Sequence, residues 1–359
     1  MIRGFFVFFL WPSALTAKEF QKFVFYLIEN YQVWSPQEEG GEVLIKELSE
    51  PEKAAFSSRL PFYSWKKFFV PECENIFEYH GNSLSPVWQM PAGKKGLALL
   101  GLNILDLKSV LLYDRVFSAK GGSASGREKD PYYQNRRLTT LVIAHSLLPN
   151  EEHNMARIAY NQINLKHYKF DIFLEQQTFS LSAKGGQPPA SFKIFTGSEK
   201  GQKVLDNFGY KDYEHIEFVG QINEDRPGSK MTAFRDKLKN HHNQKIWEEL
   251  GKICIECGKC TIVCPTCFCF RIDDFSRDTS AGERQRCWDS CFYNEFSEVA
   301  GGHKFLNSTA QRIHFWYFHK FARIPDEFSM TGCVGCKRCA TVCPVGIDIK
   351  KVLLDIENS

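Results

Sequence analysis

Apolar residues in the first 228 positions alternate between helical and strand-like spacing. They recur at helical spacing over 17–30, where Thr16 is available as an N-cap, and again over 107–117 and 200–208. Short apolar runs predict strands between these helices at 43–45, 68–70, 97–102, 138–144, 170–174 and 192–195. This alternation predicts an α/β domain over residues 1–228.

The clearest α/β unit is the strand at 97–102 followed by the helix at 107–117. Its turn, 103–106, either presents Asn103 and Asp106 to a ligand or uses Asp106 as a simple helix cap. Farther along, Arg136 and Arg137 follow two tyrosines. They either bind a phosphate or a partner's carboxylates, or lie as ordinary arginines in a solvated loop, and composition favours the loop.

The periodicity changes after Arg226-Pro227-Gly228-Ser229, which marks the expected domain boundary. A basic amphipathic helix is expected over 231–250, and its lysines are interpreted as a solvated face. Helical spacing returns in the aromatic segment 312–321, whose rings are expected to build a core. His314 and His319 are five residues apart there, which argues against a shared metal. Residues 229–359 are therefore predicted to form a second, mainly α-helical domain.

Two cysteine motifs dominate this second domain. They read Cys254-x-x-Cys257-x-x-Cys260-x-x-x-Cys264-Pro265 and Cys333-x-x-Cys336-x-x-Cys339-x-x-x-Cys343-Pro344. In two-cluster ferredoxins the fourth cysteine of each run ligates the other cluster. The spacing thus predicts one [4Fe–4S] cluster on Cys254, Cys257, Cys260 and Cys343, and a second on Cys333, Cys336, Cys339 and Cys264. A zinc ribbon is the alternative, but it has no place for the third cysteine of each run.

The insert between the motifs is much longer than a minimal ferredoxin needs, and it contains further cysteines. A third metal site is one interpretation, since four soft ligands occur there: Cys267, Cys269, Cys287 and Cys291. The preferred interpretation is that these thiols pack near the clusters as buried groups that hydrogen-bond to sulfur.

Composition adds limits on function. Forty-five basic and 42 acidic residues give a net charge of +3, which gives no case for nucleic-acid binding. All but one of the 13 cysteines follow position 250, so they indicate metal binding in a reducing compartment, and Cys73 is expected to be a buried structural thiol.

Residues 1–17 match an export signal only weakly; a mis-called start or a packed first strand is preferred. With no apolar run long enough for a membrane span, a soluble cytoplasmic protein is expected.

Several of these segments together resemble a known family. The chain is similar to the β subunit of cytosolic sulfhydrogenases, which are bidirectional NAD(P)-linked [NiFe] hydrogenases, and to the related first subunit of anaerobic sulfite reductase. The specific segments are 263–270, Trp288-Asp289-Ser290-Cys291, Ala300-Gly301-Gly302-His303, His319-Lys320 and Cys333-Val334-Gly335-Cys336. The N-terminal domain resembles the family more loosely, through 68–71, 101–107 and 130–137.

The chain also departs from this family pattern. Leu105 stands where the family usually has a cysteine, and the cysteine-bearing segment that usually follows the Arg-Arg strand is absent from 144–158. Cys287 is an additional cysteine. A metal or redox role for the N-terminal domain is therefore not expected.

The resemblance implies an electron-transfer subunit rather than an enzyme. The sequence has neither a G-x-G-x-x-G fingerprint after a strand nor a P-loop, and it lacks the cysteine pairs of a nickel–iron centre. FAD and NAD(P) are thus expected on a partner subunit, with the [NiFe] hydrogenase small and large subunits as the other partners. A ferredoxin-like subunit of a sulfite reductase, or a subunit that itself reduces polysulfide, is the alternative.

Overall fold

The computed structural model describes residues 14–81, 83–87, 95–118, 129–151, 162–177, 191–224, 230–240 and 245–358. The expectations for residues 1–13 and for the domain boundary at 226–229 lie outside these residues. The division at 228/229 therefore stays a prediction.

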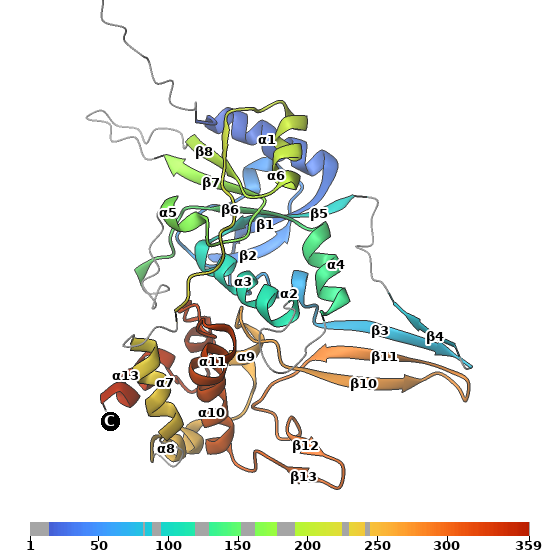
Figure 1. Ribbon diagram of the computed structural model, residues 1–359, viewed down its shortest axis with the longest axis vertical. Coiled ribbons are helices and arrows are strands. Elements are labelled where there is room, and N and C mark those ends of the chain that lie inside the picture. Colours follow the sequence, from blue (N-terminus) through green and yellow to red (C-terminus); the bar gives the residue numbers. More distant parts are fainter. Residues whose placement is uncertain are drawn as a thin grey trace, which may run out of the picture.

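A seven-stranded sheet forms the centre of the N-terminal part (Figure 1). Its order is β2 (Glu42–Glu47), β1 (Tyr31–Glu39), β5 (Gly96–Leu102), β6 (Leu141–His145), β7 (Ile172–Gln177), β8 (Ser191–Thr196) and β9 (Tyr213–His215). The four strands from β1 to β7 in this order are parallel, while β2 and β8 run antiparallel to their inner neighbours. The central strands are almost wholly apolar because both faces are covered.

Helices cover both faces of this sheet. α1 (Ala17–Asn30) and α6 (Glu199–Phe208) pack on one face in one apolar cluster, and α3 (Ile104–Ser118) with α4 (Pro131–Thr139) pack on the other. Thr16 caps α1 through a capping box with Glu19, as the sequence predicts. Short helices η1 (Pro51–Lys53), α2 (Lys66–Phe69) and α5 (Gln162–Leu165) lie in the connections.

A second, four-stranded sheet joins the two halves of the chain. Its order is β10 (Phe270–Ser276), β11 (Ala281–Trp288), β3 (Cys73–His80) and β4 (Ser83–Pro86), all antiparallel. β3 belongs to the N-terminal part and β11 to the insert between the cysteine motifs. The insert thus adds strands beside the N-terminal domain (Figure 1), and the small hairpin β12 (Glu298–Val299) and β13 (His303–Lys304) follows them.

The C-terminal part is mainly helical, as expected. Its elements are α7 (Lys230–Asn240), α8 (Lys245–Ile253), α9 (Lys259–Ile262), α10 (Thr309–Phe318), the π-helical turn η3 (His319–Arg323), α11 (Ile324–Phe328), α12 (Arg338–Thr341) and α13 (Ile349–Asn358). Aromatic side chains of α8, α10 and η3 form its core, led by Trp247, Trp316, Tyr317 and Phe321. This confirms the structural role predicted for the aromatic segment.

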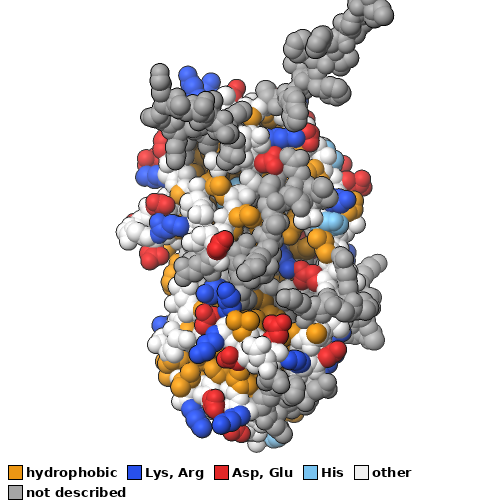
Figure 2. All heavy atoms as spheres, turned by 90° about the vertical axis from the view of Figure 1, so that its left-hand side faces the viewer, with side chains coloured by type: hydrophobic (Ala, Val, Ile, Leu, Met, Phe, Trp, Pro, Cys, Tyr) orange, Lys and Arg blue, Asp and Glu red, His pale blue; other side chains and the backbone are white. Residues whose placement is uncertain are grey.

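The molecular surface bears charges of both signs. On the face shown in Figure 2, basic and acidic side chains are interspersed, and apolar ones gather toward the lower end, at the height of α7 and α13 in Figure 1. None of the described helices is long and apolar enough to cross a membrane.

Three local predictions are wrong. Residues 68–70 do not form a strand, since Phe68 and Phe69 end the short helix α2. Arg136 and Arg137 lie in α4, because Asp130 caps that helix and Pro131 occupies its first turn, and β6 begins only at Leu141. In the turn before α3 the capping side chain is Asn103, whose Oδ1 accepts hydrogen bonds from the backbone N–H groups of Leu105 and Asp106.

Candidate functional site

The first three cysteines of the first motif and the last cysteine of the second line one cavity. These are Cys254, Cys257, Cys260 and Cys343, with Cys339 at the same cavity. The cavity measures about 50 Å³, several times what one water requires, and its walls are mainly apolar side chains of Phe292, Ile313, Trp316 and Ile349. The structure therefore brings these four cysteines together, while their crosswise assignment as ligands of one cluster stays a prediction.

The two motifs share one backbone geometry. In the first, Glu256 and Gly258 have φ of 58° and 70°; in the second, the equivalent Gly335 and Lys337 have φ of 76° and 57°. A short helix follows in each case, α9 or α12. These left-handed residues turn the chain around the second cysteine of each motif, so that three thiols approach a common centre.

Backbone N–H groups also point at the thiols. The N–H of Gly335 donates to Cys333 Sγ and that of Ile347 to Cys343 Sγ, both at 3.3 Å. At the equivalent place in the first motif, burial raises the pKa of the Cys254 thiol while a hydrogen bond from the Glu256 backbone opposes that rise. Such N–H···S bonds stabilise thiolate ligands and influence the potential of an iron–sulfur cluster.

The second set of cysteines is more deeply buried. Cys264 and Cys336 are 8% and 6% exposed. Burial raises the pKa of Cys333 to about 11, and it likewise raises the pKa values of Cys336 and Cys339; the negative charge of Cys264 adds to each rise. Lys320 Nζ contacts both Cys264 Sγ and the carbonyl oxygen of Gly332, so Cys264 lies beside the start of the second motif, although it belongs to the first in sequence.

The donor set fits a multi-iron cluster. Among the residues that the structure describes, no three His, Cys, Asp or Glu side chains are grouped closely enough to hold a single metal ion. Instead, the first four thiols line a cavity with mainly apolar walls, and in the second set Cys264 and Cys336 are buried while Cys333 and Cys339 are half-buried. Soft thiolates in this arrangement suit a [4Fe–4S] cluster, whose irons each take one cysteine.

The four cysteines of the predicted third site do not gather as one set. Cys287 forms a disulfide with Cys73. Hydrogen bonding joins Cys267 to Cys264, lowering the pKa of Cys264 and raising that of Cys267, and a similar pair joins Cys269 to Cys291. These two pairs agree with the interpretation of extra thiols as hydrogen-bonding neighbours of the clusters.

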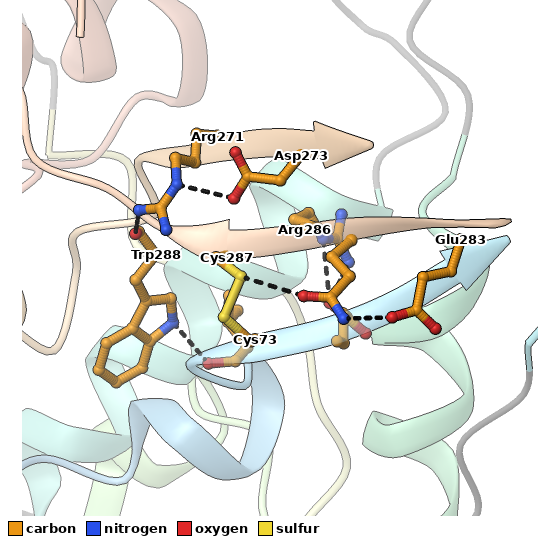
Figure 3. The surroundings of a disulfide bond; sticks show 10 residues. Cys73, Arg271, Asp273, Glu283, Arg286, Cys287 and Trp288 are labelled. Carbon is orange, nitrogen blue, oxygen red and sulfur yellow. Dashed lines mark hydrogen bonds and ion pairs between the residues drawn. A yellow bond between two sulfur atoms is a disulfide. The ribbon is translucent and has the colours of Figure 1, made fainter. Parts of the chain in front are cut away.

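The disulfide corrects the expectation for Cys73, which is exposed rather than buried and is not a free thiol. Cys73 and Cys287 are directly opposite each other on β3 and β11 (Figure 3). Beside them, the Trp288 indole N–H donates to the carbonyl of Val70 at 2.9 Å, and Arg286 pairs with Glu74 at 2.6 Å. In the sequence, the cysteines indicate a reducing compartment, where disulfides are rare. The Cys73–Cys287 disulfide does not fit that interpretation.

Arg136 and Arg137 form ion pairs with carboxylates of the protein itself. Arg136 forms two hydrogen bonds to Glu74, at 2.7 and 3.3 Å, and Arg137 lies 3.2 Å from Asp114. They stabilise α4 against β3 and α3. His314 packs on Trp247 and His319 on Phe268.

Two buried cations were missed as site residues by sequence reasoning. Arg338, between Cys336 and Cys339, pairs with the fully buried Asp106 at 3.0 Å and so ties the start of α3 to the second motif. Lys320 is 2% exposed and lies 3.3 Å from Cys264 Sγ. The available signal was a basic residue within an apolar or cysteine-rich segment, where a solvated position is not expected.

Comparison with known proteins agrees with this geometry. Residues 253–347 match the family model of a 4Fe–4S dicluster domain. The chain is 26% identical over 353 residues to the sulfhydrogenase 2 subunit beta of Pyrococcus furiosus, covering 96% of this chain and 98% of that protein. No solved structure matches the chain.

Proposed function

We propose that this chain, a homologue of a sulfhydrogenase β subunit with a C-terminal 4Fe–4S dicluster domain, relays electrons between two partner subunits. One partner carries flavin and NAD(P), and the other is a [NiFe] hydrogenase module. The relay uses two [4Fe–4S] clusters on the eight motif cysteines. The observation that carries this proposal is the crosswise convergence of Cys343 with Cys254, Cys257 and Cys260 around one cavity.

Each bound cluster would accept and release one electron at a time. The chain's own residues hold the clusters and set their surroundings. The first set of cysteines is partly exposed, and Ile253 and Ile255 beside it are 48% and 61% exposed. The second set lies deeper, against the core that Asp106 and Arg338 join.

These surroundings favour a partner at the mouth of the first cavity. Exposed apolar side chains next to a redox site are typical of a protein–protein contact. Helix α8, which follows α7 and leads to Cys254, and the segment after Cys343 border this region. We propose that they form the contact with one of the two electron-transfer partners. The relative's name, a subunit of a sulfhydrogenase, favours the hydrogenase complex over a sulfite reductase.

Removal of the first cluster tests the relay. In the assembled complex, Cys257→Ala should abolish NAD(P)-linked oxidation of hydrogen, because electrons can no longer cross this subunit. Reduction of an artificial dye by hydrogen should continue, since that reaction takes electrons at the hydrogenase subunits. Both rates are measured on the same purified complex.

Assembly is the control for this experiment. The variant complex must contain all subunits, and a matched Lys211→Met complex, altered at an exposed lysine of the N-terminal domain, should keep NAD(P)-linked activity. Survival of both activities in the Cys257→Ala complex would show that the cluster is structural, and the relay proposal would then be wrong.

A further inference from the structure

Lys320 is held against the second set of cysteines by a π-helical turn. It lies in η3, directly after α10. Its Nζ is 3.3 Å from Cys264 Sγ, 3.1 Å from Thr266 Oγ1 and 3.1 Å from the carbonyl oxygen of Gly332. These three partners match the three N–H donors of an ammonium group.

The backbone around Lys320 is fixed as well. The N–H of Gly332 donates to the Lys320 carbonyl at 2.8 Å. A Cβ on residue 332 would come within 2.9 Å of Lys320 Cα, so only glycine allows this approach. Gly332 directly precedes Cys333, and the π-helical turn is therefore locked to the start of the second motif. Such π-helical turns often occur at functional sites.

The charge of Lys320 has no carboxylate partner among the described residues. Its polar contacts are a thiol, a hydroxyl and a carbonyl, and its side chain is almost completely buried. An uncompensated ammonium is costly in such a place. A cluster held by four thiolates would supply the missing negative charge at this point.

We propose that Lys320 is a positioning residue that raises the reduction potential of the second cluster. This inference rests on the proposed function. Reduction adds one negative charge to a buried cluster, which burial alone opposes. A fixed positive charge and an N–H···S bond at Cys264 stabilise that added charge, and both raise the potential.

Arg338 and its partner Asp106 allow a variant that should shift the reduction potential of the same cluster in the opposite direction. Its guanidinium lies beside Cys336, but Asp106 compensates its charge at 3.0 Å. Asp106→Asn removes the negative charge and keeps the side-chain shape. The potential of the second cluster should therefore rise in this variant, whereas loss of the Lys320 charge should lower it.

The test is a redox titration, followed by electron paramagnetic resonance, of the full chain reconstituted anaerobically. Cys257→Ala identifies which signal belongs to the second cluster. Lys320→Met should decrease the equilibrium constant for reducing that cluster at least tenfold, about 59 mV for a one-electron couple. Lys320→Arg, which keeps the positive charge, should retain most of the wild-type equilibrium constant for reduction. Lys245→Met, at an exposed lysine, should shift neither signal.

The directions of the shifts separate electrostatics from damage. Opposite shifts in Lys320→Met and Asp106→Asn support the inference, because simple disruption has no reason to reverse sign. An unchanged potential in Lys320→Met at full iron content, or equal signs in both variants, would overturn it. If Lys320→Met loses the cluster, Asp106→Asn decides: a zero or downward shift overturns the inference. A wild-type chain with fewer than two clusters would contradict the proposed function instead.

Discussion

Glu256 and Lys337 have a left-handed backbone conformation that non-glycine residues rarely adopt. Their φ values are 58° and 57°, and such residues cost on the order of 1–3 kcal/mol each. The cost is offset if the turn brings three thiols and the neighbouring N–H groups to one centre. Gly258 and Gly335 take the other left-handed position in each motif without this strain.

Crosswise ligation leads to a prediction for single cysteines. Cys264→Ala should damage the cluster on Cys333, Cys336 and Cys339, because Cys264 lies with that motif in space. Cys343→Ala should damage the cluster on the first motif. Spectra of the two variants should therefore show exchanged defects. If each variant loses the cluster of its own motif, the assignment of the fourth ligands is wrong.

At the scale of elements, the sequence predicted what local periodicity and spacing determine. α1, β5 and α6 follow apolar patterns within one segment, and the cysteine spacing identified both motifs. The pairing of β3 with β11 was missed because its partners are about 200 residues apart, and no local pattern selects one partner over another. The Asp106–Arg338 and Lys320–Cys264 contacts were missed for the same reason.

The pairing of β3 with β11 leads to a prediction for the disulfide. Thiol counting on the unfolded, iron-free chain should find 11 free thiols before reduction and 13 after it. Cys287→Ser should lower the free energy of unfolding by about 2–5 kcal/mol, because the bond restricts the unfolded chain. As a control, Cys291→Ser should lower both counts by one and keep the difference of two. Thirteen thiols before reduction would contradict the disulfide.

At the scale of the whole molecule, the N-terminal domain packs directly against the second cysteine motif. Val334 and Cys336 belong to the same apolar core as Trp65, Phe69 and Leu105. The second set of cysteines thus lies between the two parts of the chain, while the first set opens toward the surface. The proposed relay between two partners would need two redox sites with different access, and the two sets of cysteines differ in exposure in this way.

The central claim is that the eight motif cysteines hold two [4Fe–4S] clusters. Iron and acid-labile sulfide analysis of the anaerobically reconstituted chain tests it most directly. About eight irons and eight sulfides per chain are predicted from the two motifs. A total near twelve would add a third cluster to these two. A total near four, or a stable form that contains only zinc, would contradict the account.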